Sequence, residues 1–403
     1  MLSFDEAQAR IVAAATVLAA ETVPLDHVLG RVLAEDLRTA ADQPAFDAST
    51  MDGYALRVAD FDGELPFELD VDGETTPGTE PRPLPQGCAR RIFTGAPLPA
   101  GADAIEMQEE VAFDGNTRRA RFSRAPVVGR FVRRAGEDLK RGEIAIARGS
   151  RLFSARIALA ASLDRASLSV TQRPRVSFLA TGDELRAPGT SGAPTSIPDS
   201  ASLALAELAA HAGANVVKID RVRDDRAATE EAAARALAQA DLLVTIGGAS
   251  VGDHDHARSA LESLGVALDF WKVAMKPGKP VAFGKRANVA VLAIPGNPAS
   301  AMITFAMLGV PLLRAMQSDA SPLPRLHRAK LASNLRHEPG RMELVRAAFV
   351  DANEPTVRAL SHQASGSLLG MANADALIRI ESDVANLDAG VLVPIYLASE
   401  IFS

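Results

Sequence analysis

Four polar loops hold the residues of this chain that could do chemistry, and each loop directly follows a short apolar run. The loops are Thr181-Gly182-Asp183-Glu184, Gly247-Gly248-Ala249-Ser250, Lys276-Pro277-Gly278-Lys279 and Pro295-Gly296-Asn297-Pro298. Glycine turns and a helix N-terminus present backbone N–H groups that bind anions. Lysine side chains, with Lys272 as a third, supply point charges suited to phosphate. The residue types therefore predict an oxyanion-binding site, with an ordinary solvated surface loop as the alternative.

Carboxylates follow some of the same apolar runs. Glu184, Asp225 and Asp255 could supply the few oxygen ligands that Mg²⁺ shares with a bound phosphate. Each aspartate could equally be a turn residue or a helix cap, so both interpretations stay open. A transition-metal site at His254 and His256 is disfavoured, because no third histidine or cysteine is near in sequence.

The elements that must position these loops alternate between residues 174 and 318. Apolar runs (VSFLA, NVVKI, DLLVTI, VAVLAI) are separated by helical patterns at 201–211, 227–240 and 256–264. This alternation is typical of βαβ units around a mostly parallel sheet, whose ligands lie beyond the carboxyl ends of the strands. Residues 287–313 carry no charge, but the PGNP turn divides them into a strand and a helix of about four turns, each too short to cross a membrane.

The rest of the chain predicts further domains. Ser3 and Glu6 have the spacing of a capping box, and the Ala-rich segment after them predicts a helix to about Ala20. Short runs broken by proline and glycine predict a β-rich insert, and strand-like runs after Pro322, where helical patterns stop, predict a small β-barrel or sandwich. The expected fold is multidomain α/β. Its divisions are a discontinuous helical N-terminal domain (1–38 and 139–172), the insert (39–138), the α/β domain (173–320) and a C-terminal β-barrel (321–403).

Composition excludes several classes of protein. Hydrophobic residues make up 47% of the chain and charged residues 23%, which is typical of folded domains. Aromatic residues are only 4% and the net charge is −7, so binding to nucleic acid or to an anionic membrane is not expected. Cys88 is the only cysteine, and the N-terminus lacks the pattern of a signal peptide, so we expect a cytoplasmic protein.

Read in order, the motifs resemble one family. Eight strings are similar to those of the molybdopterin molybdenumtransferases, the family of MoeA and the gephyrin E domain. They are FDASTMDGYALR, RIFTGAPLPAGADAIEMQEE, RRAGEDLKRGE, FLATGDEL, GGASVGDHD, MKPGKPVAFGK, AIPGNPASA and PGRMELVRA. The resemblance runs from about Phe4 to the C-terminus. It implies a four-domain subunit whose α/β domain is like the molybdopterin adenylyltransferases.

The resemblance also implies a reaction. Molybdate is bound beside adenylylated molybdopterin, the phosphoanhydride is hydrolysed with Mg²⁺, AMP leaves, and molybdenum enters the dithiolene. Lysines, glycine turns and a helix N-terminus are groups that such anionic substrates require, and Mg²⁺ offsets charge that develops at the pyrophosphate.

Site residues follow from the matching strings. The resemblance implies Mg²⁺-linked carboxylates at Glu184 and Asp255, and other catalytic residues at Asp52, Thr94, Arg134, Asp138 and Asp225. It implies substrate-binding residues at Gly247, Gly248, Ser250, Lys272, Lys276, Lys279, Pro295, Gly296, Asn297, Pro298, Ser300, Arg341 and Ser365.

The resemblance also leads to expectations about the oligomer, the partner proteins and two alternative functions. The family forms elongated homodimers, and we expect each site to draw on both chains, with Asp52 of one facing Asp255 of the other. A molybdopterin adenylyltransferase and acceptor molybdoenzymes are the expected partners. The alternatives are adenylylation itself, which the three additional domains disfavour, and a gephyrin-like scaffold, which the lack of a fused second enzyme domain or long linker disfavours.

Overall fold

The computed structural model describes residues 1–248, 256–351 and 354–402. For His256 it describes the backbone alone. The chain divides into two compact units, which are taken one at a time below. The first comprises residues 1–35, 148–157 and 166–403, and the second comprises residues 36–147 and 158–165. Helix α2 (Ser154–Ser162) contains residues of both.

A six-stranded sheet forms the centre of the first unit. Its order is β16 (Asn215–Val222), β13 (Arg175–Thr181), β17 (Leu242–Ile246), β21 (Val289–Ile294), β20 (Ala282–Arg286) and β18 (Ala267–Trp271). The first four are parallel, and β20 and β18 are antiparallel to their neighbours. The four predicted apolar runs are thus strands of one mostly parallel sheet.

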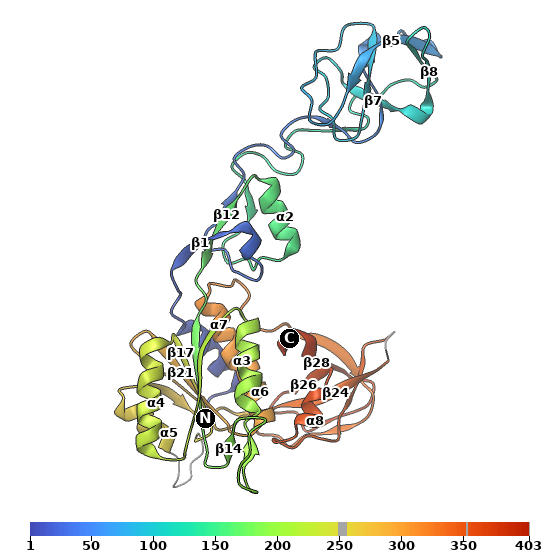
Figure 1. The fold of residues 1–403 in the computed structure, drawn as a ribbon. Helices are drawn as coiled ribbons and strands as arrows, with labels where there is room; N and C mark the ends of the chain where they lie inside the picture. Colours follow the sequence, from blue (N-terminus) through green and yellow to red (C-terminus); the bar gives the residue numbers. More distant parts are fainter. Residues whose placement is uncertain (249–255, 352–353, 403) are drawn as a thin grey trace. The chain divides into compact units, whose positions relative to one another are not determined.

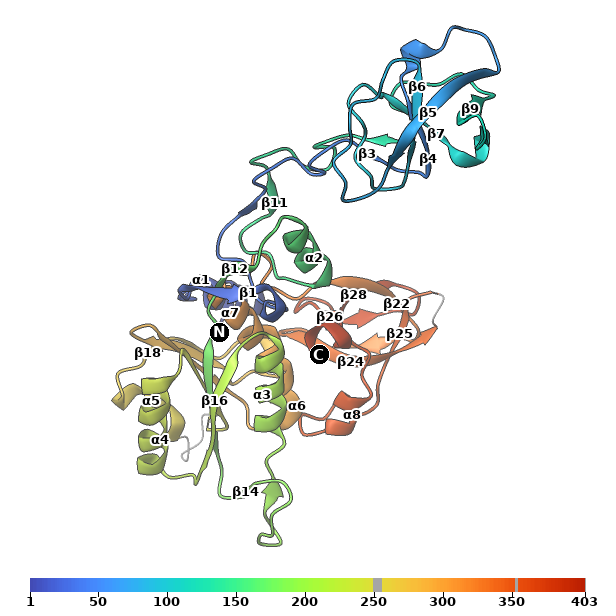
Figure 2. The same cartoon turned by 45° about the horizontal axis from the view of Figure 1, so that its top comes forward.

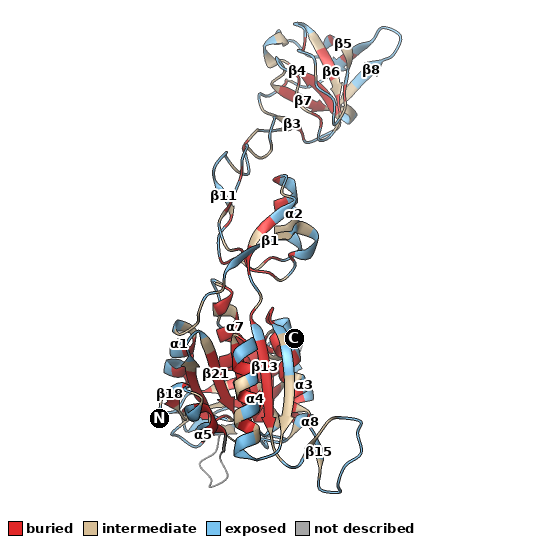
Figure 3. Ribbon diagram, turned by 60° about the vertical axis from the view of Figure 1, so that its left-hand side comes forward, coloured by how far each residue is buried: buried red, intermediate tan, exposed pale blue. Residues whose placement is uncertain are grey.

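Helices cover both faces of this sheet (Figure 1). Helices α4 (Arg226–Gln239) and α5 (His256–Ser263) lie on one face, and α3 (Ala201–His211) and α6 (Pro298–Thr304) lie on the other. Successive residues of β13 point to opposite faces, so that Phe178 packs in the core with α3 and Leu179 packs in the core with α4. The central strands are accordingly buried along their length (Figure 3).

The helix after the PGNP turn is longer than the sequence suggested. Helix α6, a π-helical turn (Phe305–Gly309) and α7 (Val310–Met316) form one continuous helix of 19 residues. In length and composition this helix could cross a membrane, and it is the only such helix in the described part of the chain. Of its most apolar 18-residue stretch, 89% is buried inside the protein, so this helix belongs to the core of the α/β fold.

The N-terminal helix is shorter than predicted. Helix α1 runs from Phe4 to Ala13, and Ser3 caps it by accepting a hydrogen bond from the Glu6 amide at 3.2 Å. The Glu6 carboxylate pairs with Arg10 at 2.9 Å, so only half of the expected capping box forms. Beyond it, β1 (Ala20–Pro24) pairs with β12 (Ser167–Thr171). Thr22 and Val23 are β-branched and favour a strand, and Pro24 cannot continue a helix.

A closed barrel follows the α/β fold. Its strands pair in the order β24 (Met342–Asp351), β25 (Thr356–Ala359), β22 (His327–Leu331), β28 (Leu392–Leu397) and β26 (Ala376–Ile380). Strand β26 then pairs with β24, which closes the barrel (Figure 2). Two short helices, α8 (Leu368–Ala372) and α9 (Ala398–Ile401), were not expected. The two-residue strand β19 (Met275–Lys276) pairs with β24 and so connects the lysine loop to the barrel.

The second unit has a β-sheet of its own, as the sequence predicted for the insert. Its order is β7 (Ala104–Met107), β4 (Gly53–Leu56), β6 (Cys88–Ile92), β5 (Phe67–Thr75), β9 (Arg119–Phe122) and β8 (Val111–Asp114). Tyr54, Phe67 and Phe122 form its apolar core. Short pairs β3 (Ala48–Ser49) with β10 (Val132–Arg133), and β2 (Leu37–Arg38) with β11 (Ile144–Ile146), complete it.

Candidate functional site

Three of the predicted loops meet where the parallel strands end. The last residues of β13, β17 and β21 are in register, with Ala180 opposite Ile246 and Ile246 opposite Ile294. A Cβ atom added to Gly247 would lie 2.9 Å from the Thr181 carbonyl oxygen, and one added to Gly296 would lie 3.3 Å from the Gly247 Cα. Side chains at these glycines would force the loops apart, so the close approach depends on glycine.

A pocket of about 430 Å³ opens beside these loops. It lies where the lysine loop and the start of α6 meet the barrel. Seven of the predicted substrate-binding residues line it: Lys276, Lys279, Pro295, Asn297, Ser300, Arg341 and Ser365. They come from four stretches of the sequence, at 276–279, 295–300, 341 and 365, and the fold brings them together.

Asn297 is the link between the α6 N-terminus and the barrel. Pro298 takes the first helical position and Asn297 takes the cap position. The Asn297 side chain makes no cap hydrogen bond, however, and its Nδ2 donates to Ser365 Oγ at 3.0 Å. The Ser300 amide also donates to the Ser365 carbonyl oxygen at 3.3 Å. The loop that carries Ser365 is therefore held against the first turn of α6.

Arg346 and Gln363 line the pocket and were not predicted from the sequence. Arg346 is 2% exposed, and its guanidinium donates to Gln363 Oε1 at 3.3 Å, to the Ser367 carbonyl oxygen at 3.2 Å and to the Ala364 carbonyl oxygen at 3.1 Å. Burial lowers the pKa of this guanidinium. Arg346 thus brings a buried positive charge to the pocket wall and fixes the loop that presents Ser365.

The three predicted lysines are not equivalent. Lys276 and Lys279 line the pocket, whereas Lys272 does not; its backbone has φ +81° and its amide donates to the Val281 carbonyl oxygen at 2.8 Å. Lys276 Nζ lies 2.9 Å from Glu343 Oε1, an acidic pocket residue that the sequence did not point to. Only the pairing of β19 with β24, which places Lys276 opposite Glu343, could have revealed it.

Of the predicted carboxylates of the α/β fold, the structure describes Glu184 and Asp225. Glu184 is exposed and folds back over its own loop, with Oε2 2.6 Å from where a Cβ on Gly182 would lie. Asp225 caps α4 by accepting from the Ala228 amide at 2.8 Å, the helix-cap alternative that the sequence left open. Asp255 and Ser250 lie outside the described residues. The described residues contain no group of three histidine, cysteine or acidic side chains that could hold a metal ion.

In the second unit, Asp52 and Thr94 are brought together. Asp52 Oδ1 accepts from both the amide and the hydroxyl of Thr94, each at 2.8 Å. These two hydrogen bonds lower the pKa of the Asp52 carboxyl, with a smaller contribution from the charge of Arg91. Asp52 is therefore held as a partly exposed, ionised carboxylate.

The other two predicted residues of the second unit have separate partners. Arg134 Nη1 donates to Asp47 at 2.7 Å, and the Ala135 amide donates to the same carboxylate at 2.8 Å. Although burial raises the pKa of Asp47, these hydrogen bonds lower it by more. Asp138 pairs with Arg133. Arg134 and Asp138 are thus engaged in different ion pairs of the same turn.

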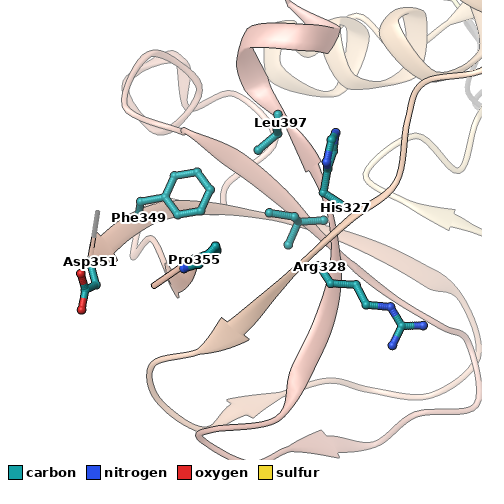
Figure 4. A pocket seen from close by; sticks show the side chains of 7 residues that line it. His327, Arg328, Phe349, Asp351, Pro355 and Leu397 are labelled. Atoms are coloured by element: carbon teal, nitrogen blue, oxygen red, sulfur yellow. The ribbon is translucent and has the colours of Figure 1, made fainter. Parts of the chain in front are cut away.

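Another pocket, of about 450 Å³, lies on the barrel away from the predicted residues. Phe349, Pro355 and Leu397 form much of its wall, and the Arg328 side chain points away from Phe349 and Pro355 (Figure 4). His327 Nε2 is hydrogen-bonded to the Glu400 carboxylate at 3.1 Å. This apolar pocket lacks the convergent cations that oxyanion substrates need, so the lysine pocket is the candidate functional site.

Comparison with known families gives matches over most of the chain. The MoeA N-terminal region (domain I and II) matches residues 2–163, a probable molybdopterin binding domain matches residues 177–315, and the MoeA C-terminal region (domain IV) matches residues 328–398. The candidate pocket draws residues from the second and third of these regions.

Individual proteins are similar over nearly their whole length. A molybdopterin molybdenumtransferase of Haemophilus influenzae is 33% identical over 98% of both chains, and molybdopterin molybdenumtransferase 2 of Mycobacterium tuberculosis is 35% identical over 93% of this chain and 94% of its own. A crystal structure of the molybdopterin biosynthesis moeA protein from Pyrococcus horikoshii superposes with a TM-score of 0.86 at 26% identity. It covers 98% of this chain and 100% of its own.

Proposed function

This chain belongs to the molybdopterin molybdenumtransferase family, and from this premise we propose how it works as a molybdenum insertase of molybdenum cofactor biosynthesis. Adenylylated molybdopterin and molybdate bind together, the phosphoanhydride is hydrolysed, AMP leaves, and molybdenum enters the dithiolene. The observation that carries this proposal is the lysine pocket, in which Lys276, Lys279 and Arg341 converge beside the N-terminus of α6. Molybdate and phosphate groups are the anions that such a pocket suits.

Substrate positioning is the task of the pocket residues. Lys279 and Arg341 supply charge, and Ser300 and Ser365 supply hydroxyl groups. These donors are fixed before the substrate arrives, because Asn297 and Arg346 already hold the Ser365 loop. Preorganised donors stabilise charge that develops during hydrolysis without a further cost of reorganisation.

Mg²⁺ could bind here with only a few ligands from the protein. The ion is commonly held by one or two carboxylates together with substrate phosphates, so a cage of three acidic side chains is not required. Glu184, exposed on the loop that adjoins Gly247, is suited to this role, with Asp255 as its proposed companion. When bound, the ion would neutralise charge on the pyrophosphate.

The second unit would complete the site from another chain. We propose a homodimer in which Asp52 and Thr94 of one subunit act on the substrate held by the partner's α/β domain, with Arg134 and Asp138 nearby. The ionised Asp52 carboxylate, held by Thr94, supports a role in orienting water or metal. The same proposal includes the division into four domains and a cytoplasmic location. It also includes two partners: an adenylyltransferase that supplies adenylylated molybdopterin, and molybdoenzymes that receive the finished cofactor.

The alternative of adenylylation is not favoured. Family matches extend over the N-terminal and C-terminal regions as well as the α/β domain, and the pocket itself requires barrel residues. The decisive experiment supplies adenylylated molybdopterin, molybdate and Mg²⁺, omits each in turn, and measures AMP and molybdenum cofactor. We expect both products only with the complete mixture. Formation of adenylylated pterin from ATP and molybdopterin would instead support the alternative.

A further inference from the structure

Arg91 lies beside Asp52 on one face of the sheet of the second unit. In the pairing of β4 with β6, Arg91 is directly opposite Tyr54, so both side chains are on the same face. Asp52 precedes Tyr54 by two positions, and the Gln108 amide continues the ladder by donating to the Asp52 carbonyl oxygen at 3.0 Å. The charge of Arg91 also reaches the Asp52 carboxyl, whose pKa it helps to lower. Arg91 therefore belongs to the surroundings of the Asp52 and Thr94 pair.

Neutral groups hold the Arg91 guanidinium in place. Its Nη1 donates to the Tyr54 hydroxyl at 3.2 Å, and its Nη2 donates to Gln108 Oε1 at 2.6 Å. The guanidinium carbon lies 5.6 Å from the centre of the Tyr54 ring and 5.2 Å from that of the Phe93 ring, within the range of cation–π attraction. Tyr54 is 1% exposed and belongs to the apolar core of this unit. The Arg91 side chain is thus oriented before any ligand arrives.

Arg91 has no ion-pair partner among the residues that the structure describes; its polar contacts are the two neutral side chains. Glu74 is opposite Arg91 in the register of β5 and β6 but makes no ion pair with it. Its sequence neighbour Arg90, on the opposite face, donates to Asp72 at 2.8 Å, and the predicted site residue Arg134 is also paired with a carboxylate. Arg91 therefore carries an uncompensated charge in a chain whose net charge is −7.

A guanidinium held in this way suits an oxyanion. The contacts to Tyr54 and Gln108 use only part of its fork, so further N–H donors are available to a ligand. A planar guanidinium binds phosphate through paired hydrogen bonds, and a side chain that is already oriented loses less entropy on binding. An ionised Asp52 would by itself repel phosphate oxygens, and a nearby cation offsets that repulsion.

We propose that Arg91 is the cation with which the second unit binds the phosphoanhydride of the substrate, next to Asp52. The inference rests on the function proposed above, in which Asp52 and Thr94 act on adenylylated molybdopterin. Tyr54, Phe93 and Gln108 are then positioning residues, because they orient the guanidinium without neutralising it.

The test is the turnover assay with the full chain, in which AMP release is measured while adenylylated molybdopterin and molybdate are varied separately. Arg91→Met should lower kcat/KM for the adenylylated pterin by about tenfold to a hundredfold, the loss expected for a hydrogen-bonded charge. The KM for molybdate should not change, because molybdate is assigned to the lysine pocket. Arg91→Lys keeps the charge without the fork and should lose less. Arg121→Met, at an exposed position of β9, is the matched control and should behave like the wild type.

A second variant separates binding from a structural role. Gln108→Glu keeps the shape of the side chain that accepts from Arg91 but gives the guanidinium an ion-pair partner. If Arg91 only supported the fold, this stronger contact would leave turnover unchanged. We expect kcat/KM for the adenylylated pterin to fall while the thermal unfolding midpoint does not, because the charge that the substrate needs is neutralised.

The outcomes distinguish this inference from the proposed function. If the wild type releases AMP and Arg91→Met or Gln108→Glu retains its kcat/KM, the inference is overturned and the proposed function stands. A change in the KM for molybdate alone also overturns it, because Arg91 would then serve the other substrate. If the wild type releases no AMP from the complete mixture, the proposed function fails and the inference with it.

Discussion

Replacing Arg346 with methionine tests whether the pocket wall is held in place from behind. Arg346→Met keeps the length of a buried side chain but removes three guanidinium contacts, to Gln363, Ala364 and Ser367. Each contributes about 1 kcal/mol net, and relief from burying the charge offsets part of the loss, so the free energy of unfolding should fall by about 1–3 kcal/mol. The barrel should remain folded.

Molybdate affinity should fall as well. Without Arg346 the loop is free to leave α6, so Ser365 no longer meets Asn297 and the pocket also loses a positive charge. We expect a weakening of about tenfold to a hundredfold, equivalent to about 1.4–2.8 kcal/mol. Calorimetric titration with molybdate measures the affinity, and urea denaturation measures the stability.

An arginine elsewhere on the barrel provides the control. Arg358 lies on β25 and is exposed, so Arg358→Met changes the same residue type without touching the pocket. This variant should match the wild type in affinity and nearly so in stability. If Arg346→Met retains wild-type affinity for molybdate, the Ser365 loop is held by other contacts and the reasoning is refuted.

Further expectations concern charge, metal, assembly and pH. Lys279→Ala should weaken binding of pterin or molybdate with little change in stability, and unchanged affinity for both would exclude its oxyanion role. Asp255→Asn should lower AMP release steeply while substrate still binds, whereas an unaltered Mg²⁺ dependence would place the ion elsewhere. Mixing inactive Asp52→Ala and Asp255→Ala subunits should restore about a quarter of wild-type activity if sites are shared, and no recovery despite verified subunit exchange would reject sharing. Burial raises the pKa of Glu106, opposed mainly by the charge of Arg130, so its ionised form weakens the folded state and the penalty disappears as the pH falls through the raised pKa. Glu106→Gln should therefore stabilise the protein at neutral pH and reduce the pH dependence of its thermal unfolding; an unchanged profile would contradict this.

Local patterns predicted the α/β part of the site well. Strands such as β13 and β21 are short apolar runs whose ends are marked by glycine, proline or asparagine, and parallel pairing alone brings their loops to one edge. Lys276, Lys279 and the start of α6, which were singled out by residue type and spacing, line one pocket, whereas Lys272 does not. That this pocket binds an oxyanion stays a prediction.

Residues that depend on tertiary pairing escaped prediction. Glu343 and Arg346 lie on a barrel strand more than sixty residues after Lys276, and only the register of β19 with β24 brings them to the pocket. Asn297 occupies the cap position of α6, but its side chain donates a hydrogen bond to Ser365 instead of capping the helix. A sequence pattern cannot weigh a local hydrogen bond against a competitor that the fold supplies from elsewhere.

The junction between the lysine loop and the barrel also affects how the protein is made. All six strands of the central sheet are complete by Ile294, whereas Arg341, Arg346 and Ser365 are synthesised afterwards. Because domains tend to fold in the order in which they leave the ribosome, the α/β fold can form while its pocket still lacks one wall. A growing or prematurely terminated chain would therefore hold molybdate poorly, and metal capture would wait until the barrel has closed.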